Sequence, residues 1–82
     1  MELKDTIDGM ISDDYKERFK AEYKQLVIRL EKLEIIINKA KDKSLEFNLS
    51  CPLKVLETQA WYMKSYAEIL RNRAGYEDIN LD

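Results

Sequence analysis

The sequence predicts an all-α protein, a two-helix antiparallel hairpin with a short N-terminal arm that assembles through a second apolar face. Three observations predict it. Two long stretches carry apolar residues at alternating intervals of three and four, which is the helical seam pattern. Only nine or ten residues separate these stretches, so they must fold back on each other. The second stretch also carries apolar residues that its seam does not use. All 82 residues form one predicted domain.

The first predicted helix covers about residues 13–42. Ser12, Asp13 and Asp14 supply an N-cap and an acidic first turn, which favours a helix start because carboxylates complement the positive end of the helix dipole. A short helical arm is predicted for the first ten residues. The seam that follows has no Pro or Gly and consists of Phe19, Tyr23, Leu26, Leu30, Leu33, Ile37 and Ala40.

The segment 43–51 is predicted to be a connector rather than a flexible linker. Its apolar residues Leu45, Phe47 and Leu49 alternate, which indicates an extended strand of chain with one face against the end of the hairpin.

The second helix is predicted for about residues 52–74, followed by a loosely docked acidic tail at 75–82. Pro52 suits the first position of a helix, and Gly75 suits the position just after its end. Antiparallel pairing matches positions whose numbers sum to about 93, so Ile37 meets Leu56 and Leu30 meets Met63. The seam of this helix consists of Leu53, Leu56, Ala60, Met63, Ala67, Leu70 and Ala74.

A second group of apolar residues lies away from the seam. A lone two-helix hairpin would expose this group, and the combined patch exceeds what soluble monomers usually show. Packing of identical chains is the favoured interpretation, because symmetric association is a common solution for such hairpins. The alternatives are cover by the arm or the connector, and a different protein partner. The predicted interface residues are Ile28, Ile35, Val55, Trp61, Tyr62, Tyr66 and Ile69.

The composition argues against several functional classes. With 14 basic and 16 acidic residues the net charge is −2, so no overall field favours sequence-specific nucleic-acid binding. A chain without histidine and with Cys51 as its one cysteine is a poor source of metal ligands or of an activated nucleophile. We therefore expect no cofactor and no enzymatic activity. Neither a signal peptide nor a membrane-spanning run is evident, which predicts a cytoplasmic protein.

One cluster could bind a ligand. Antiparallel pairing places basic and tyrosine side chains from the start of the first helix near those from the end of the second. Arginines can bind phosphate through two hydrogen bonds, and a tyrosine ring can stack on a base. The competing interpretation is simple charge compensation at a helix end. The predicted ligand-binding residues are Tyr15, Arg18, Lys20, Arg71, Arg73 and Tyr76.

The stretches "SDDYKERFKAEYKQL", "RLEKLE" and "CPLKVLETQ...M..Y.EIL..RA" resemble a family of short helical proteins encoded by crAss-like phages and by phages and prophages of gut bacteria. The similarity covers roughly residues 10 to 75, and the Cys-Pro helix start is its most specific part. The resemblance implies a small accessory phage protein that acts in the cytoplasm of an infected bacterium.

Accessory phage proteins of this kind commonly act by binding, and antagonism of anti-phage defence is a frequent role. By analogy with helical phage sponges, we expect a homo-oligomer that sequesters a phosphorylated nucleotide-type immune signal. The alternatives are an inhibitor that binds a host defence protein directly, such as a CRISPR effector, or a structural or accessory phage protein.

Overall fold

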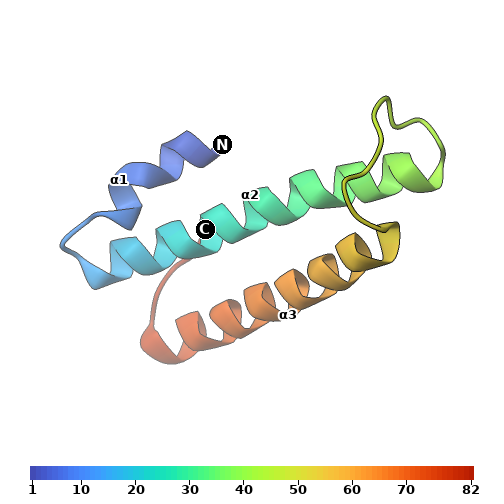
Figure 1. Ribbon diagram of the computed structural model, residues 1–82. Coiled ribbons are helices and arrows are strands. Elements are labelled where there is room, and N and C mark those ends of the chain that lie inside the picture. The colour runs from blue at the N-terminus through green and yellow to red at the C-terminus, as the bar shows by residue number, and fades with distance from the viewer.

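The computed structural model describes residues 1–82 and contains only helices and connecting segments. A 3₁₀ turn, η1 (Leu3–Thr6), leads into the short helix α1 (Ile7–Met10), and two long helices follow, α2 (Tyr15–Lys41) and α3 (Leu53–Glu77). Figure 1 shows α2 and α3 side by side in opposite directions, with η1 and α1 along the other side of α2. The predicted all-α hairpin with an N-terminal arm is confirmed.

The hairpin seam forms two apolar clusters in the predicted register. Near the connector, Leu30, Ile37 and Ala60 are buried, with Leu33 and Leu56 packed against them. At the other end the buried cluster consists of Phe19, Leu26, Ala67, Leu70, Ala74 and Ile79. The small alanines of α3 lie opposite large side chains of α2, which allows the two helices to approach closely.

Both long helices start at residues that favour a helix start. The side chain of Asp14 accepts a hydrogen bond from the backbone N–H of Lys16, so α2 begins at Tyr15. Pro52 lies one position before α3 with an extended ψ of 143°, and Leu53 is the first helical residue. Pro52 is therefore the N-cap rather than the first residue of the helix.

The connector between α2 and α3 bends instead of running straight. Lys43 adopts a left-handed conformation with φ of 64°, and Asp42 accepts hydrogen bonds from Ser44. Leu45 and Leu49 are half-buried, but a bend leaves Phe47 59% exposed. The predicted alternation therefore fails at Phe47.

The end of α3 differs from the expectation based on Gly75. The helix continues through Gly75 to Glu77, and Asp78 takes the left-handed capping conformation with φ of 57°. The N–H groups of Asp78 and Ile79 both donate to the carbonyl of Ala74. This turn directs Ile79 into the apolar cluster, where it is buried. The C-terminal segment is thus packed into the core rather than loosely docked, because its apolar residues gain more from burial than from exposure.

The N-terminal arm covers part of the face of α2 that points away from the seam. Gly9 lies so close to Ala21 that an added Cβ would come within 2.8 Å of the alanine Cβ. Ala21 and Ile28, seven residues apart on this face, are both buried, whereas Ile35 beyond them is 54% exposed. Ile28 is therefore already buried within the single chain, which leaves little of its side chain for the interface between chains that the sequence predicted.

Candidate functional site

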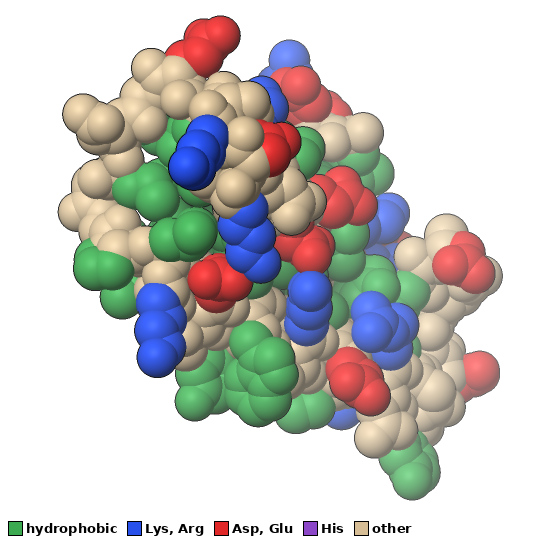
Figure 2. Space-filling view, turned by 90° about the vertical axis from the view of Figure 1, so that its right-hand side faces the viewer, with side chains coloured by type: hydrophobic (Ala, Val, Ile, Leu, Met, Phe, Trp, Pro, Cys, Tyr) green, Lys and Arg blue, Asp and Glu red, His purple; other side chains and the backbone are tan.

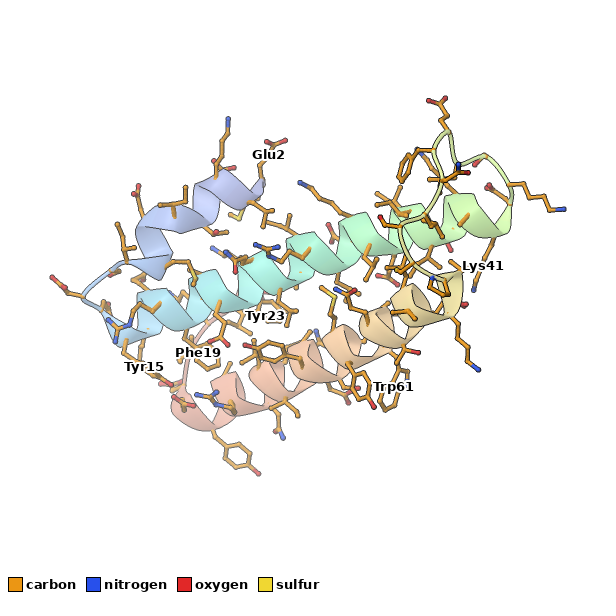
Figure 3. The ribbon with its side chains drawn as sticks, viewed as in Figure 1. Glu2, Tyr15, Phe19, Tyr23, Lys41 and Trp61 are labelled. Atoms are coloured by element: carbon orange, nitrogen blue, oxygen red, sulfur yellow. The ribbon has the colours of Figure 1, made fainter.

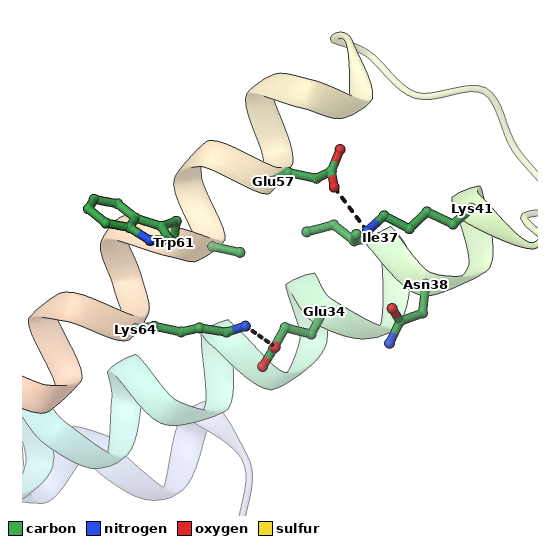
Figure 4. Close-up of a pocket in the computed structure, with 8 residues that line it drawn as sticks. Glu34, Ile37, Asn38, Lys41, Glu57, Trp61 and Lys64 are labelled. Atoms are coloured by element: carbon green, nitrogen blue, oxygen red, sulfur yellow. Dashed lines mark ion pairs between the residues drawn. The ribbon is translucent and has the colours of Figure 1, made fainter.

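A groove lies between α2 and α3 near the connector (Figure 4). Its volume is about 200 Å³. Ile37 and Ala60, both buried, supply apolar surface at its base. The complete lining consists of Glu34, Ile37, Asn38 and Lys41 from α2 and of Glu57, Ala60, Trp61 and Lys64 from α3.

Two ion pairs cross the groove. The Nζ atom of Lys64 lies 3.0 Å from Oε2 of Glu34, and the Nζ atom of Lys41 lies 3.0 Å from Oε2 of Glu57. On each helix the two charged residues are seven positions apart, so they occupy the same flank of the seam. All four side chains are substantially exposed. Exposed pairs of this kind contribute only about 0–1 kcal/mol each, so either lysine can turn to another anion at small cost.

Trp61 forms one wall of the groove and is 62% exposed. Its ring meets that of Tyr62 edge to face, with centroids 5.0 Å apart. The surface beyond Trp61 is also hollowed, between Lys54, Thr58 and Tyr62. The groove therefore combines an aromatic surface, an amide, two ammonium groups and the two carboxylates that are paired with them, so its charges are balanced.

The predicted ligand-binding cluster at the opposite end of the hairpin is only partly assembled (Figure 3). The hydroxyl of Tyr15 donates to Glu77 Oε1 at 2.6 Å and accepts from Arg73 Nη2 at 3.0 Å. The Nε atom of Arg73 lies 3.2 Å from Glu77 Oε2, and its guanidinium lies 5.0 Å from the ring centroid of Phe19. Glu77 was not predicted to take part, and it compensates the charge of Arg73.

The pKa values in this cluster follow from these hydrogen bonds. The bond to Glu77 raises the pKa of Tyr15, because it stabilises the protonated hydroxyl. The same bond, together with Arg73, lowers the pKa of Glu77. The bond from Arg73 to Glu77 raises the pKa of the guanidinium. These hydrogen bonds join the start of α2 to the end of α3, with Tyr15 neutral, Arg73 positive and Glu77 negative.

The other predicted ligand-binding residues do not join Tyr15 and Arg73 in one site. Arg71 donates to the hydroxyl of Tyr23 at 3.1 Å, and Tyr23 lies eight residues beyond Tyr15 along α2. Arg18 donates to the carbonyl of Ser12, in the segment that joins the arm to α2.

Lys20 and Tyr76 are also separated from that cluster. Lys20 pairs with Glu17 at 3.5 Å, and both line a hollow on the side of the arm. Tyr76 is 87% exposed. In a single chain, the six predicted residues therefore do not form one pocket.

Most of the predicted interface residues are exposed as expected. Val55, Tyr62 and Ile69 project from α3 with more than half of each side chain accessible, and Trp61 does the same. Tyr66 is less exposed because its hydroxyl donates to the carboxylate of Glu22 on α2.

Sequence reasoning missed the charged residues of the groove, above all Lys41 and Lys64. Their signal was present, since each long helix carries a glutamate followed seven residues later by a lysine, and antiparallel packing then sets each lysine against a glutamate of the other helix. Trp61 had been assigned to an interface and not to a ligand.

No helix of the chain is both long and apolar enough to span a bilayer. The structure also contains no cluster of three or more His, Cys, Asp or Glu side chains that could hold a metal ion.

No curated protein and no solved structure is significantly similar to this chain. One protein-family model does match it, over residues 13–76, which is nearly the same part of the chain as the resemblance found in the sequence. That range includes all of α2, the connector and all but the last residue of α3, and therefore every residue that lines the groove. A match over that share of the molecule establishes the family, and the chain belongs to the Sequestin family.

Proposed function

We propose that the protein is a phage-encoded, non-enzymatic antagonist of bacterial anti-phage defence. It binds a phosphorylated nucleotide-type immune signal in a homo-oligomer and withholds it from its receptor. It acts in the cytoplasm of the infected bacterium. The family name supports the general activity, since it describes sequestration. The resemblance to phage and prophage proteins supports the biological setting.

The groove beside Trp61 is the observation that carries the nucleotide assignment. An exposed indole provides a stacking surface for a base, worth about 1–3 kcal/mol in single-stranded nucleic-acid complexes. Lys41 and Lys64 stand on the same flank and can exchange Glu57 and Glu34 for phosphate oxygens. The released carboxylates can accept hydrogen bonds from ribose hydroxyls or base amino groups.

The groove is better suited to a phosphorylated ligand than the predicted cluster at the other end. There Arg73 already binds Glu77 and Tyr15, and displacing a carboxylate held by both groups costs more than turning an exposed lysine. Arg71, with the hydroxyl of Tyr23 as its partner, retains free donors.

Thermal unfolding in the presence of cyclic dinucleotides and ADP-ribose derivatives tests the proposal. A bound nucleotide should raise the melting temperature, by an amount equivalent to about 2.7 kcal/mol at 100 times its dissociation constant. Trp61→Ala and Lys64→Gln should remove most of that gain. Lys32→Gln is the matched control, since Lys32 is an exposed α2 lysine outside the groove.

The variants also distinguish the two locations. If Arg71→Ala and Arg73→Ala abolish the shift while Lys64→Gln leaves it intact, the ligand lies at the opposite end of the hairpin. If no nucleotide of either class shifts the melting curve of the wild type, the nucleotide assignment is wrong.

A second function is favoured by the adjacent exposed aromatic residues on α3. The rings of Trp61 and Tyr62 contact each other, and both are exposed to solvent. Tryptophan and tyrosine are enriched at protein interfaces. The protein would then inhibit a host defence protein, such as a CRISPR effector, by direct binding. Co-purification of one defence protein that Trp61→Ala abolishes, together with no nucleotide effect, would favour this function. A structural or accessory role in the phage predicts neither result.

A further inference from the structure

We infer that two copies of this chain pack through α3 in antiparallel orientation, about a two-fold axis at Tyr62, and that the second copy completes the nucleotide groove. The inference rests on the homo-oligomer of the proposed function and specifies its geometry. It begins from the file of Val55, Tyr62 and Ile69, which lies to one side of the hairpin seam.

This file remains uncovered by the rest of the chain. Val55 is 53% exposed, Tyr62 63% and Ile69 57%, although the arm and the C-terminal segment bury other apolar groups. The three residues are seven positions apart, so they form a straight apolar strip along α3 that another helix can match. Figure 2 shows hydrophobic side chains gathered between charged ones over the lower part of the molecule, where α3 runs.

Antiparallel packing of two α3 helices gives this strip a self-complementary register. With Tyr62 on the axis, residues at equal distances before and after it face each other, so Val55 of one copy meets Ile69 of the second copy. The surface around Ile69 is hollowed between Ser65, Glu68 and Asn72. That hollow can receive the branched side chain of Val55, and the symmetry makes the same contact twice.

The charges beside the strip favour the same arrangement. Lys54 precedes Val55 and Glu68 precedes Ile69, so both lie on the same flank of the strip. Both are exposed, and neither is among the ion pairs that the chain forms internally. In the antiparallel register Lys54 faces Glu68 of the second copy, again twice. A parallel pair would instead place the two Lys54 side chains on opposite flanks of the interface, and likewise the two Glu68 side chains, so neither ion pair could form.

The same register explains how assembly would serve the groove. Trp61 precedes Tyr62 and therefore lies on the flank that carries Lys54 and Glu68, close to the axis. The two Trp61 side chains then lie on one side of the dimer, with the mouths of both grooves beside them. Each copy thus contributes aromatic and basic groups to a shared site.

Charge reversal tests the register in full-length protein by light scattering and by sedimentation at several concentrations. We expect a dimer for the wild type. Lys54→Glu alone and Glu68→Lys alone should each weaken dimerisation roughly tenfold, because two exposed pairs change from attraction to repulsion. An equimolar mixture of these two variants should dimerise again, since one copy then carries only acidic groups at the two positions and the other only basic ones. Lys32→Glu is the control and should dimerise like the wild type.

Cysteine cross-linking separates antiparallel from parallel packing. In a Cys51→Ser background, Val55→Cys mixed with Ile69→Cys should form a disulfide-linked dimer under mild oxidation, and Val55→Cys alone should not. Cross-linking of Val55→Cys alone would overturn the antiparallel register, and a monomeric wild type would overturn the whole inference. Neither result depends on nucleotide. A dimer of the expected register that binds no cyclic dinucleotide or ADP-ribose derivative would contradict only the proposed function.

Discussion

At the scale of single residues, Glu77 shows why the predicted ligand site instead joins the two helices. It binds both Tyr15 and Arg73, and we call these three residues the Glu77 clasp. Tyr15 and Arg73 were both identified from the sequence, and they do meet. The carboxylate that joins them lies beyond the predicted end of the helix, because α3 continues to Glu77 and does not stop before Gly75. An error of three residues at a helix end therefore changed the electrostatic character of the whole cluster.

This clasp gives a prediction about pH. Glu77 has a pKa below its ordinary value of 4.5, so its bonds stabilise the fold fully above pH 4.5 and the stabilisation is lost as the pH falls through the lowered pKa. Tyr15 has a pKa above 10.0, so its contribution is fully present below pH 10.0 and is lost as the pH rises through the raised value. Glu77→Gln should reduce both losses.

Urea unfolding at a series of pH values measures the effect. The difference in unfolding free energy between wild type and Glu77→Gln should be largest near neutral pH and shrink towards both extremes. Glu68→Gln, an exposed α3 glutamate that forms no ion pair in the chain, is the control. A constant difference across the series would show that Glu77 acts through packing and not through its charge.

At the scale of helices, the sequence predicted the hairpin well and the elements around it less well. The seam register was predictable because large apolar residues such as Leu30 and Ile37 repeat at the helical period. Each of them is stable only when its side chain points towards the other helix and is buried there. The position of the arm on α2 was less predictable, since the arm is short and its apolar residues do not set a register by themselves. What the period could not reveal was how closely the arm approaches, which depends on the lack of a side chain at Gly9.

The arm therefore provides a test that uses both glycines of the chain. Gly9→Ala should destabilise the protein by about 1–3 kcal/mol, because the new Cβ would lie 2.8 Å from that of Ala21 and force the arm away from α2. Gly75→Ala is the matched control. Gly75 lies within α3 with no atom near its missing Cβ, so alanine should stabilise the helix by about 0.5–1 kcal/mol.

Urea midpoints and hydrogen exchange of the arm amides distinguish these outcomes. Gly9→Ala should accelerate exchange in η1 and α1 more than in α3. Equal stabilisation by both substitutions would mean that the arm does not pack on Ala21 as described.

At the scale of the whole molecule, the hairpin buries two apolar clusters between its helices and still exposes aromatic and apolar side chains along α3. The candidate site was only partly predictable for a physical reason. Trp61 and Tyr62 stand out in the sequence as apolar residues outside the seam. The groove, however, forms where the flanks of α2 and α3 meet. Flank residues such as Lys64 look like ordinary surface charges until α2 is placed beside them. Sequestration requires only that such a surface binds tightly and leaves its ligand intact.

Mass spectrometry of nucleotide recovered from the protein tests that requirement most directly. The protein would be incubated with a mixture of cyclic dinucleotides and ADP-ribose derivatives, separated from free nucleotide, and heated to release what it has bound. We predict that a nucleotide is retained in a fixed ratio to protein, that Trp61→Ala retains much less, and that the released molecule has the mass of the one supplied. Recovery of a cleaved or otherwise altered nucleotide, or retention of none, would contradict the account.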